Sequence, residues 1–277
     1  MGAKFRRNKC CKRLDGVVDR ISALPDDIII AILSHLSLRE AAATSVLAPR
    51  WSDLWRHTPN LDFKLSAKSA VTRWLEFVFL RSVERLEWDF QCEDASDQIV
   101  LGEVLRESGI CWGCRNLTIF TSLKSLCLKH LRVSGEDIKL FLRELPSLEL
   151  LSICYANLTS HVEVCGATLA LKHLEILHCK GGADISVSAP NLTWLCVDDI
   201  STLVLPLNVP KLVGAFFTYT SSASIDNVPH LISAISCCKY QLKTLNLTIR
   251  YPKWLFSNAI KCFIIGISLS SRIRIRG

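Results

Sequence analysis

The sequence has none of the short motifs that mark the common kinds of active site. It contains no glycine-rich phosphate-binding loop, no Gly-x-Ser-x-Gly turn for a nucleophilic serine and no His-Glu-x-x-His zinc helix. The seven histidines are scattered along the chain. We therefore expect a protein that is not an enzyme, with no catalytic residues and no cofactor.

One cysteine pair has zinc-ligand spacing, and it stands alone. Cys111 and Cys114 are two residues apart, but no second pair follows at the distance that a zinc finger needs. The thirteen cysteines are an odd number, and the charged first residues are not followed by the apolar stretch of a secretory leader. We expect reduced thiols, no metal site, and a location in the nucleus, the cytoplasm or both.

The middle of the chain has no net positive charge, although the whole chain has a net charge of +7. Residues 1–20 hold seven Lys or Arg against two Asp, and residues 250–277 hold six and no acid, which leaves the middle at −4. A basic stripe across a folded body, typical of nucleic-acid-binding proteins, is therefore not expected. The basic residues of segment 1–20 form either a nuclear import signal or a disordered, solvated tail.

No apolar run has a comfortable length for crossing a membrane. Residues 254–269 are mostly apolar, but they cover only 16 positions and include Lys261. We expect no membrane partner, and we interpret residues 251–277 as an apolar and basic tail or a final capping helix. By contrast, 49% of the residues are hydrophobic and the mean hydropathy is +0.28, so a substantial folded core is expected.

Residues 21–63 begin with an apolar stripe at helical spacing. Pro25, Asp26 and Asp27 suit the first turn of a helix, because proline fits there and carboxylates complement the positive end of the helix dipole. The stripe that follows consists of Ile28, Ile29, Ile32, Leu33 and Leu36. A first helix is therefore predicted from about Pro25.

Two further short helices are predicted in the same segment. Ser37 and Glu40 form a capping box for a second helix that starts near Leu38. Pro49 ends this helix and opens a third, in which Trp51, Leu54 and Trp55 share one face. A unit of this size buries little apolar surface, so its tryptophans either pack on the following domain or anchor a partner.

A pattern of the form Leu-x-x-Leu-x-Leu recurs every 20 to 30 residues farther along the chain. The copies begin at Leu123, Leu148, Leu171, Leu192 and Leu242, with a degenerate copy at Leu212. This period is typical of leucine-rich repeats, in which each unit supplies one short strand of a parallel stack. Residues 135–145 have helical spacing and are expected to form the outer layer of their repeat.

Weaker copies begin at Val83 and Cys114, within residues 64–120, which we interpret as a linker and degenerate first repeats. The copy at Cys114 starts only nine residues before Leu123, too few for a strand, a turn and a return layer. Either one of these two copies is not a repeat strand, or a segment is missing between them. We expect strained structure around residues 119–123.

Residues 21–63 resemble the F-box of plant F-box/leucine-rich-repeat proteins. The matching motifs are Leu24-Pro25-Asp26-Asp27, Ile32 to Leu36, Thr44 to Leu47, and Arg50-Trp51 with Leu54-Trp55. The resemblance implies a mixed α/β fold: a three-helix F-box over residues 21–63, then a leucine-rich-repeat solenoid with a curved parallel sheet over residues 121–250. Many members also carry a C-terminal FBD domain, which we expect this sequence to lack.

The resemblance also implies a function. F-box proteins bind the Skp-type adaptor, and through it the cullin, of a ubiquitin ligase, while their repeats bind a target protein, here unknown. Carried over by position, the adaptor-binding residues are Leu24, Pro25, Ile28, Leu33, Leu36, Val46 and Trp51. The alternative is a repeat scaffold outside any ligase, in which the helical module only caps the solenoid.

Overall fold

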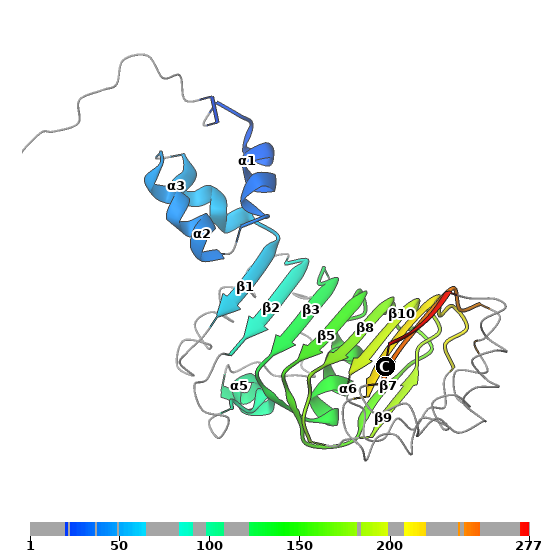
Figure 1. Cartoon of the computed structure of the whole chain (residues 1–277). Helices are drawn as coiled ribbons and strands as arrows, with labels where there is room; N and C mark the ends of the chain where they lie inside the picture. The colour runs from blue at the N-terminus through cyan, green and yellow to red at the C-terminus, as the bar shows by residue number, and fades with distance from the viewer. Residues whose placement is uncertain are drawn as a thin grey trace, which may run out of the picture. The chain divides into compact units, whose positions relative to one another are not determined.

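The computed structural model divides into two compact units, residues Met1–Thr58 and Pro59–Gly277. It describes residues 20–21, 23–36, 38–48, 50–64, 83–90, 98–107, 122–181, 184–198, 208–219, 238, 241–249 and 272–276. The first unit is helical and the second is built on a large parallel sheet (Figure 1). Each unit is described below by itself.

The helical unit contains the three helices that the sequence predicts. Its elements are α1 (Asp26–Leu33), α2 (Leu38–Ala43), the 3-10 turn η1 (Thr44–Val46), α3 (Trp51–Leu54) and the 3-10 turn η2 (Trp55–His57). Pro25 directly precedes α1, and Asp26 and Asp27 lie in its first turn, as the dipole argument requires. Ser37 and Pro49, on which the predicted cap and helix break rest, lie outside the described residues.

A small core holds these helices together. Its buried side chains are Ile29, Leu33, Ala41, Trp51 and Leu54. Asp26 and Arg50 form an ion pair that links the first turn of α1 to the residue before α3. Because both side chains are well exposed, this pair orients the two helices more than it stabilises them.

The second unit forms a nine-stranded parallel sheet within its described residues. The strand order is β1-β2-β3-β5-β8-β10-β11-β12-β13, and Figure 1 shows the arrowheads of the first six along one edge. The strands are β1 (Asn60–Lys64), β2 (Arg85–Asp89), β3 (Ser125–Lys129), β5 (Leu150–Cys154), β8 (His173–Leu177), β10 (Trp194–Asp198), β11 (Gly214–Tyr219), β12 (Thr244–Ile249) and β13 (Arg272–Arg276). Every repeat strand predicted from Leu123 onward is therefore confirmed, and so is the weaker one at Val83.

The leucine pattern explains why these strands stack in register. Each strand of the large sheet from β2 to β12 starts two residues after the first apolar residue of its copy. In β2, β3, β5, β8, β10 and β11 the last two apolar positions of the pattern are buried. Across five neighbouring strands, the third apolar position pairs as Leu128, Ile153, Ile176, Val197 and Phe217, all essentially inaccessible to solvent. Each strand thus completes the burial of its neighbour.

The layer behind the large sheet is shorter and less regular. It contains α6 (Gly135–Glu144), which confirms the helix predicted over residues 135–145, and the short strands β4 (Arg132–Val133), β6 (Asn157–Leu158), β7 (Val162–Cys165) and β9 (Ile185–Ser188). The side chain of Ser134 accepts a hydrogen bond from the Asp137 amide, and Asp137 bonds back to the Ser134 amide. This capping box sets the start of α6.

Several elements were not predicted from the sequence. They include β1, α5 (Leu101–Glu107), β13 and the short strands β4, β6, β7 and β9. The interpretation of residues 251–277 as a tail or capping helix is corrected for Arg272–Arg276, which pairs in parallel with β12. The copy at Cys114 lies outside the described residues, and β2 pairs directly with β3, so no strand is inserted between them.

Gly214 is required where Trp194 crosses from the neighbouring strand. A Cβ atom at Gly214 would lie 2.3 Å from Cε3 of the Trp194 ring, far inside van der Waals contact. The same ring packs on Phe216 with a centroid distance of 4.6 Å. Trp194 is therefore held between a bare backbone and a second aromatic ring.

We predict that Gly214→Ala lowers the free energy of unfolding by about 1–3 kcal/mol, because the added methyl group overpacks the Trp194 ring. In a Trp194→Ala background the same substitution should have almost no effect, since the clashing ring is gone. Urea unfolding followed by far-ultraviolet circular dichroism measures both. An equal loss in the two backgrounds would show that the contact with Trp194 is not the reason for glycine here.

Candidate functional site

Large apolar side chains of the helical unit are exposed to solvent. On α1, Ile28 and Ile32 are 44% and 42% exposed, and they lie one turn apart on the same helix face. At the end of η1, Val46 and Leu47 are 88% and 65% exposed. We call these four residues the apolar surface residues, because exposed side chains of this kind mark binding sites when they gather on one small unit.

The seven predicted adaptor-binding residues fall into three groups. Pro25, Ile28 and Val46 are exposed, Leu24 and Leu36 are partly buried against the helical core, and Leu33 and Trp51 are fully part of that core. A small unit has few large side chains, and it must use some of them to hold itself together. Leu33 and Trp51 therefore support the surface from beneath rather than offering side-chain area to a partner.

Two of the apolar surface residues are not among the adaptor-binding residues predicted from the sequence. Ile32 and Leu47 have the same helical periodicity as their neighbours, so periodicity alone does not separate them from core residues. What separates Ile28 from Ile29 is a rotation of about 100° around the helix axis, and the direction of the core sets which of them is buried. That direction depends on α3, which is distant in sequence.

The second candidate surface is the side of the large sheet that carries the residues between the buried leucines. We call it the open face. On β3, for example, Ser125, Cys127 and Lys129 are partly exposed while Leu126 and Leu128 are buried. Because the strands are parallel and in register, open-face residues of equivalent positions form rows across the sheet.

The last positions of the open face are joined by polar contacts. Lys129 forms an ion pair with Glu87 of β2, which raises the pKa of Lys129. The hydroxyl of Ser152 donates a hydrogen bond of 3.1 Å to Glu175 of β8 and lies 3.3 Å from the sulfur of Cys154. These contacts run across strands β2 to β8 and fix the side chains of the face.

Two cysteines of this network have opposite acidities. The thiol of Cys127 donates a hydrogen bond to Cys154, which lowers the pKa of Cys154 below the usual value of a thiol and raises that of Cys127. Burial raises the pKa of Cys179 to about 12 and that of Cys196 to about 11. Cys154 is therefore the first of these four thiols to lose its proton as the pH rises.

A row of stacked rings stands at the edge where the strands end. His130, Tyr155 and His178 directly follow β3, β5 and β8, and their ring centroids are 5.1 and 4.9 Å apart. At the two ends of the row, Nδ1 of His130 lies 2.7 Å from Oδ1 of Asp89, and Nδ1 of His178 lies 2.7 Å from Oδ2 of Asp198. Both carboxylates are buried. We call the three rings the ring row.

The sequence interpretation of this edge was incomplete. It singled out neither His178 nor Asp198, whereas the structure joins them as a pair. A signal was present, since all three rings stand two positions after the last apolar residue of their copies: Leu128, Ile153 and Ile176. Equivalent positions of stacked repeats are neighbours in space.

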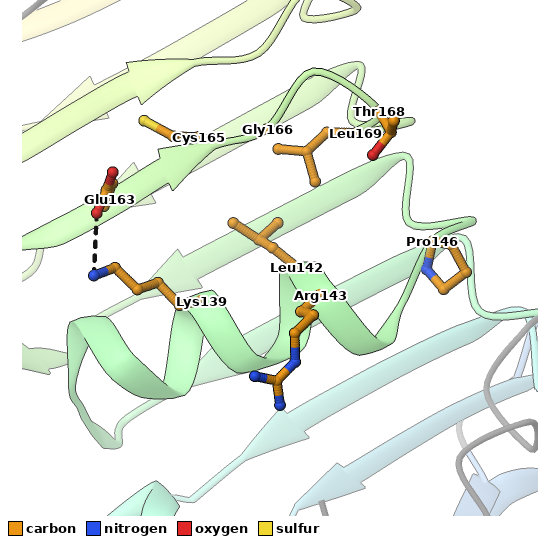
Figure 2. Close-up of a pocket in the computed structure, with 9 residues that line it drawn as sticks. All are labelled: Lys139, Leu142, Arg143, Pro146, Glu163, Cys165, Gly166, Thr168 and Leu169. Carbon is orange, nitrogen blue, oxygen red and sulfur yellow. Dashed lines mark ion pairs between the residues drawn. The ribbon is translucent and has the colours of Figure 1, made fainter. Parts of the chain in front are cut away.

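A pocket of about 510 Å³ lies between α6 and the segment from β7 to Leu169 (Figure 2). Its most prominent polar contact is the ion pair between Lys139 and Glu163, at 3.1 Å. Each partner favours the charged form of the other, so the pKa of Glu163 is lowered and that of Lys139 raised. Burial raises the pKa of Cys165, the thiol in the same lining. The lining thus holds a closed ion pair and a protonated thiol, a poor basis for nucleophilic chemistry.

Within the described ranges, no group of three or more His, Cys, Asp and Glu side chains is placed to hold a metal ion. Among the helices that the structure describes, none combines the length and the apolar character needed to cross a membrane.

Comparison with known proteins identifies both parts of the chain. Residues 21–63 match the family model of the F-box domain, and residues 110–252 match that of the At1g61320/AtMIF1 leucine-rich-repeat domain. The chain is similar to three Arabidopsis thaliana proteins. These are the FBD-associated F-box protein At3g52670 (26% identity over 85% of this chain and 68% of the relative), the F-box/LRR-repeat protein At3g03360 (25%, 76% and 53%) and the F-box/FBD/LRR-repeat protein At3g52680 (25%, 84% and 62%). The chain thus spans between about half and two thirds of the length of these relatives.

The burial pattern of α1 predicts unequal effects of two alanine substitutions. Leu33→Ala should lower the free energy of unfolding by about 2–5 kcal/mol, because it leaves a cavity in the helical core. Ile28→Ala should stay within about 0.5 kcal/mol of the parent, since its side chain is already well exposed. Chemical denaturation of the full chain, followed by circular dichroism, compares them. Equal losses would contradict the assignment of the two α1 faces.

The thiol pair predicts a specific change in acidity. Cys127→Ala should raise the pKa of Cys154 toward the usual thiol value, because the largest cause of its lowered pKa is the Cys127 hydrogen bond. The ultraviolet absorbance of thiolate at neutral pH should then fall to the level of Cys154→Ser, a variant without that thiolate. An unchanged absorbance in Cys127→Ala would place the cause of the low pKa elsewhere.

Proposed function

Since this chain belongs to the family of plant F-box/leucine-rich-repeat proteins, we propose that it recruits a target protein to a Skp–cullin–F-box ubiquitin ligase. In this proposal the helical unit binds the Skp-type adaptor, and through it the cullin, and the repeat unit binds the target. The chain itself performs no covalent chemistry and needs no cofactor. It acts by raising the local concentration of target lysines near a charged ubiquitin-conjugating enzyme.

The observation that carries the proposal is the set of apolar surface residues on the helical unit. Five large aliphatic side chains, the four apolar surface residues and Ile21, are between 42% and 88% exposed on a unit of fewer than 60 residues. Such a unit gains stability by burying these side chains in a partner, and each one fully buried contributes about 1.5–3 kcal/mol. A match to the F-box model over the same residues supports the Skp-type adaptor as that partner.

The rival function is a repeat scaffold outside any ligase, with the helical unit as a cap of the solenoid. The helical unit has a core of its own, built from residues of α1, α2 and α3. The chain divides into compact units between Thr58 and Pro59. These features favour the adaptor-binding role.

We also propose that the protein works in the nucleus, the cytoplasm or both. The cysteines that the structure describes are free thiols, which suits a reducing compartment. Nothing in this proposal involves nucleic acid or a membrane.

We predict that the full chain co-elutes with a purified Skp-type adaptor in size-exclusion chromatography. The double substitution Ile28→Asp/Val46→Asp should weaken the complex by about tenfold or more, because it places charge in an apolar interface. Neither residue belongs to the helical core, so the circular dichroism spectrum should not change.

The control is Tyr155→Asp, which puts one aspartate on an exposed apolar residue of the repeat unit and should leave adaptor binding intact. Co-elution that survives the double substitution would move the contact to another surface. A parent chain that does not co-elute at all would favour the scaffold.

A further inference from the structure

We propose that the ring row and the adjoining carboxylates of the open face bind the target, and that the bound segment is extended, basic and rich in arginine. This inference rests on the proposed function, because it assigns target recognition to the repeat unit. It adds which part of that unit makes the contact and which chemistry the target presents there.

The backbone conformation of the ring row shows that large side chains at these positions are energetically unfavourable. His130, Tyr155 and His178 have φ angles of 57°, 53° and 53°, in the left-handed region that favours glycine and asparagine. Each such residue with a large side chain costs about 1 kcal/mol or more, and strain of this kind gathers at binding sites. Glycine or asparagine would serve the turn without the ring, so the turn itself does not require aromatic residues.

The exposure of the row supplies a contact surface. Tyr155 is 50% exposed, and the His178 side chain is 53% exposed. When the histidines are neutral and Nδ1–H donates to the buried Asp89 and Asp198, Nε2 of each ring is left as an acceptor. The row therefore offers aromatic surface together with hydrogen-bonding edges, the combination that is enriched where proteins bind each other.

The charges of the open-face residues beside the ring row indicate which charge the bound segment should carry. The last two open-face positions of β2, β3, β5, β8 and β10 carry four carboxylates, Glu87, Asp89, Glu175 and Asp198, against one ammonium, Lys129. With neutral imidazoles this leaves a net charge of −3. The lowered pKa of Cys154 adds negative charge in the same place. A cationic segment is the complementary partner.

One carboxylate oxygen of this cluster has no partner. Asp198 is 9% exposed, and while Oδ2 pairs with His178, Oδ1 is buried without a hydrogen bond. A buried acceptor left in this state is unfavourable by about 1–3 kcal/mol, which a donor supplied by a ligand would recover. The cluster is therefore incomplete by itself.

Arginine fits these features better than lysine does. Its planar guanidinium stacks on aromatic rings and donates in a fork to carboxylates, whereas the lysine ammonium acts as a compact point charge. The three rings lie next to one another along this edge, with Asp89 and Asp198 at the two ends of the row. An extended segment laid along the row would meet both kinds of group.

The test uses the full chain bound to its Skp-type adaptor and immobilised. The probe is a positional-scanning library of extended peptides of about 12 residues, long enough to cross the described strands. We expect arginine to be selected over glutamate by about tenfold or more at one or more positions, with lysine between them. The best single peptide is then resynthesised for titration.

Variants separate recognition from folding. Tyr155→Asn keeps a residue that accepts positive φ and removes the ring, so it should weaken the best peptide by about tenfold with no loss of thermal stability. Glu175→Gln should weaken it by several-fold. The matched control is Glu136→Gln, which removes the same charge from an 82% exposed side chain on α6 and should leave binding unchanged.

Four outcomes overturn the inference. The first two are selection of acidic or purely apolar peptides, and no selection at all. The third is selection of arginine that Tyr155→Asn and Glu175→Gln do not affect. The fourth is tenfold tighter peptide binding after the basic residues of segment 1–20 are replaced by alanine in the full chain. The last would assign the face to the chain's own N-terminal segment. In each case retained adaptor binding leaves the proposed function standing, whereas loss of the adaptor complex by the parent chain overturns the function itself.

Discussion

The in-register burial of apolar residues between neighbouring parallel strands is the constraint on which the repeat unit depends. No strand of five or six residues buries its own leucines, so each one relies on the strand before and after it. The pairing of Leu128, Ile153 and Ile176 shows the result: one position of the pattern repeats in space at the spacing of the strands. Residues directly after the pattern are therefore aligned across neighbouring strands in the same way. The ring row exists because its three residues directly follow three neighbouring strands. Leu128, Ile153 and Ile176, two positions before the rings, pair in register and so bring the rings side by side.

The same constraint explains what sequence reasoning could predict about the fold. A leucine pattern repeated at a regular period indicates strands, stacking and register together, and these predictions held even for the degenerate copy at Leu212, where β11 forms. The strands at the two ends of the sheet carry no such pattern. β1 offers Leu61 and Phe63, and β13 alternates Arg with Ile. Their apolar and polar residues alternate as in a strand, but they lack the leading apolar residue by which the repeats were recognised. They pair with β2 and β12.

The helical unit shows where pattern reasoning stops. Apolar spacing located α1, but Ile28 and Ile29 are neighbours in sequence and have opposite environments. Which of them is buried depends on where Trp51 and Leu54 lie, and this is a property of the tertiary fold. A resemblance between sequences has the same limit. It indicates which positions belong to a binding module, but it does not separate the residues that build the surface from those that contact a partner. Trp51, whose position suggested an anchor, is instead a core residue.

The two candidate surfaces differ in chemistry, and the difference has a functional consequence. The helical unit exposes aliphatic side chains, which bind by burial and tolerate little charge in the interface. The ring row and its carboxylates favour donors and positive charge, and a purely aliphatic partner would leave Asp198 unsatisfied. A partner suited to one surface is therefore penalised at the other. In the proposed function, where the helical unit binds an adaptor and the repeat unit binds a target, such opposed chemistry would keep the two binding events from competing without any coupling between the units.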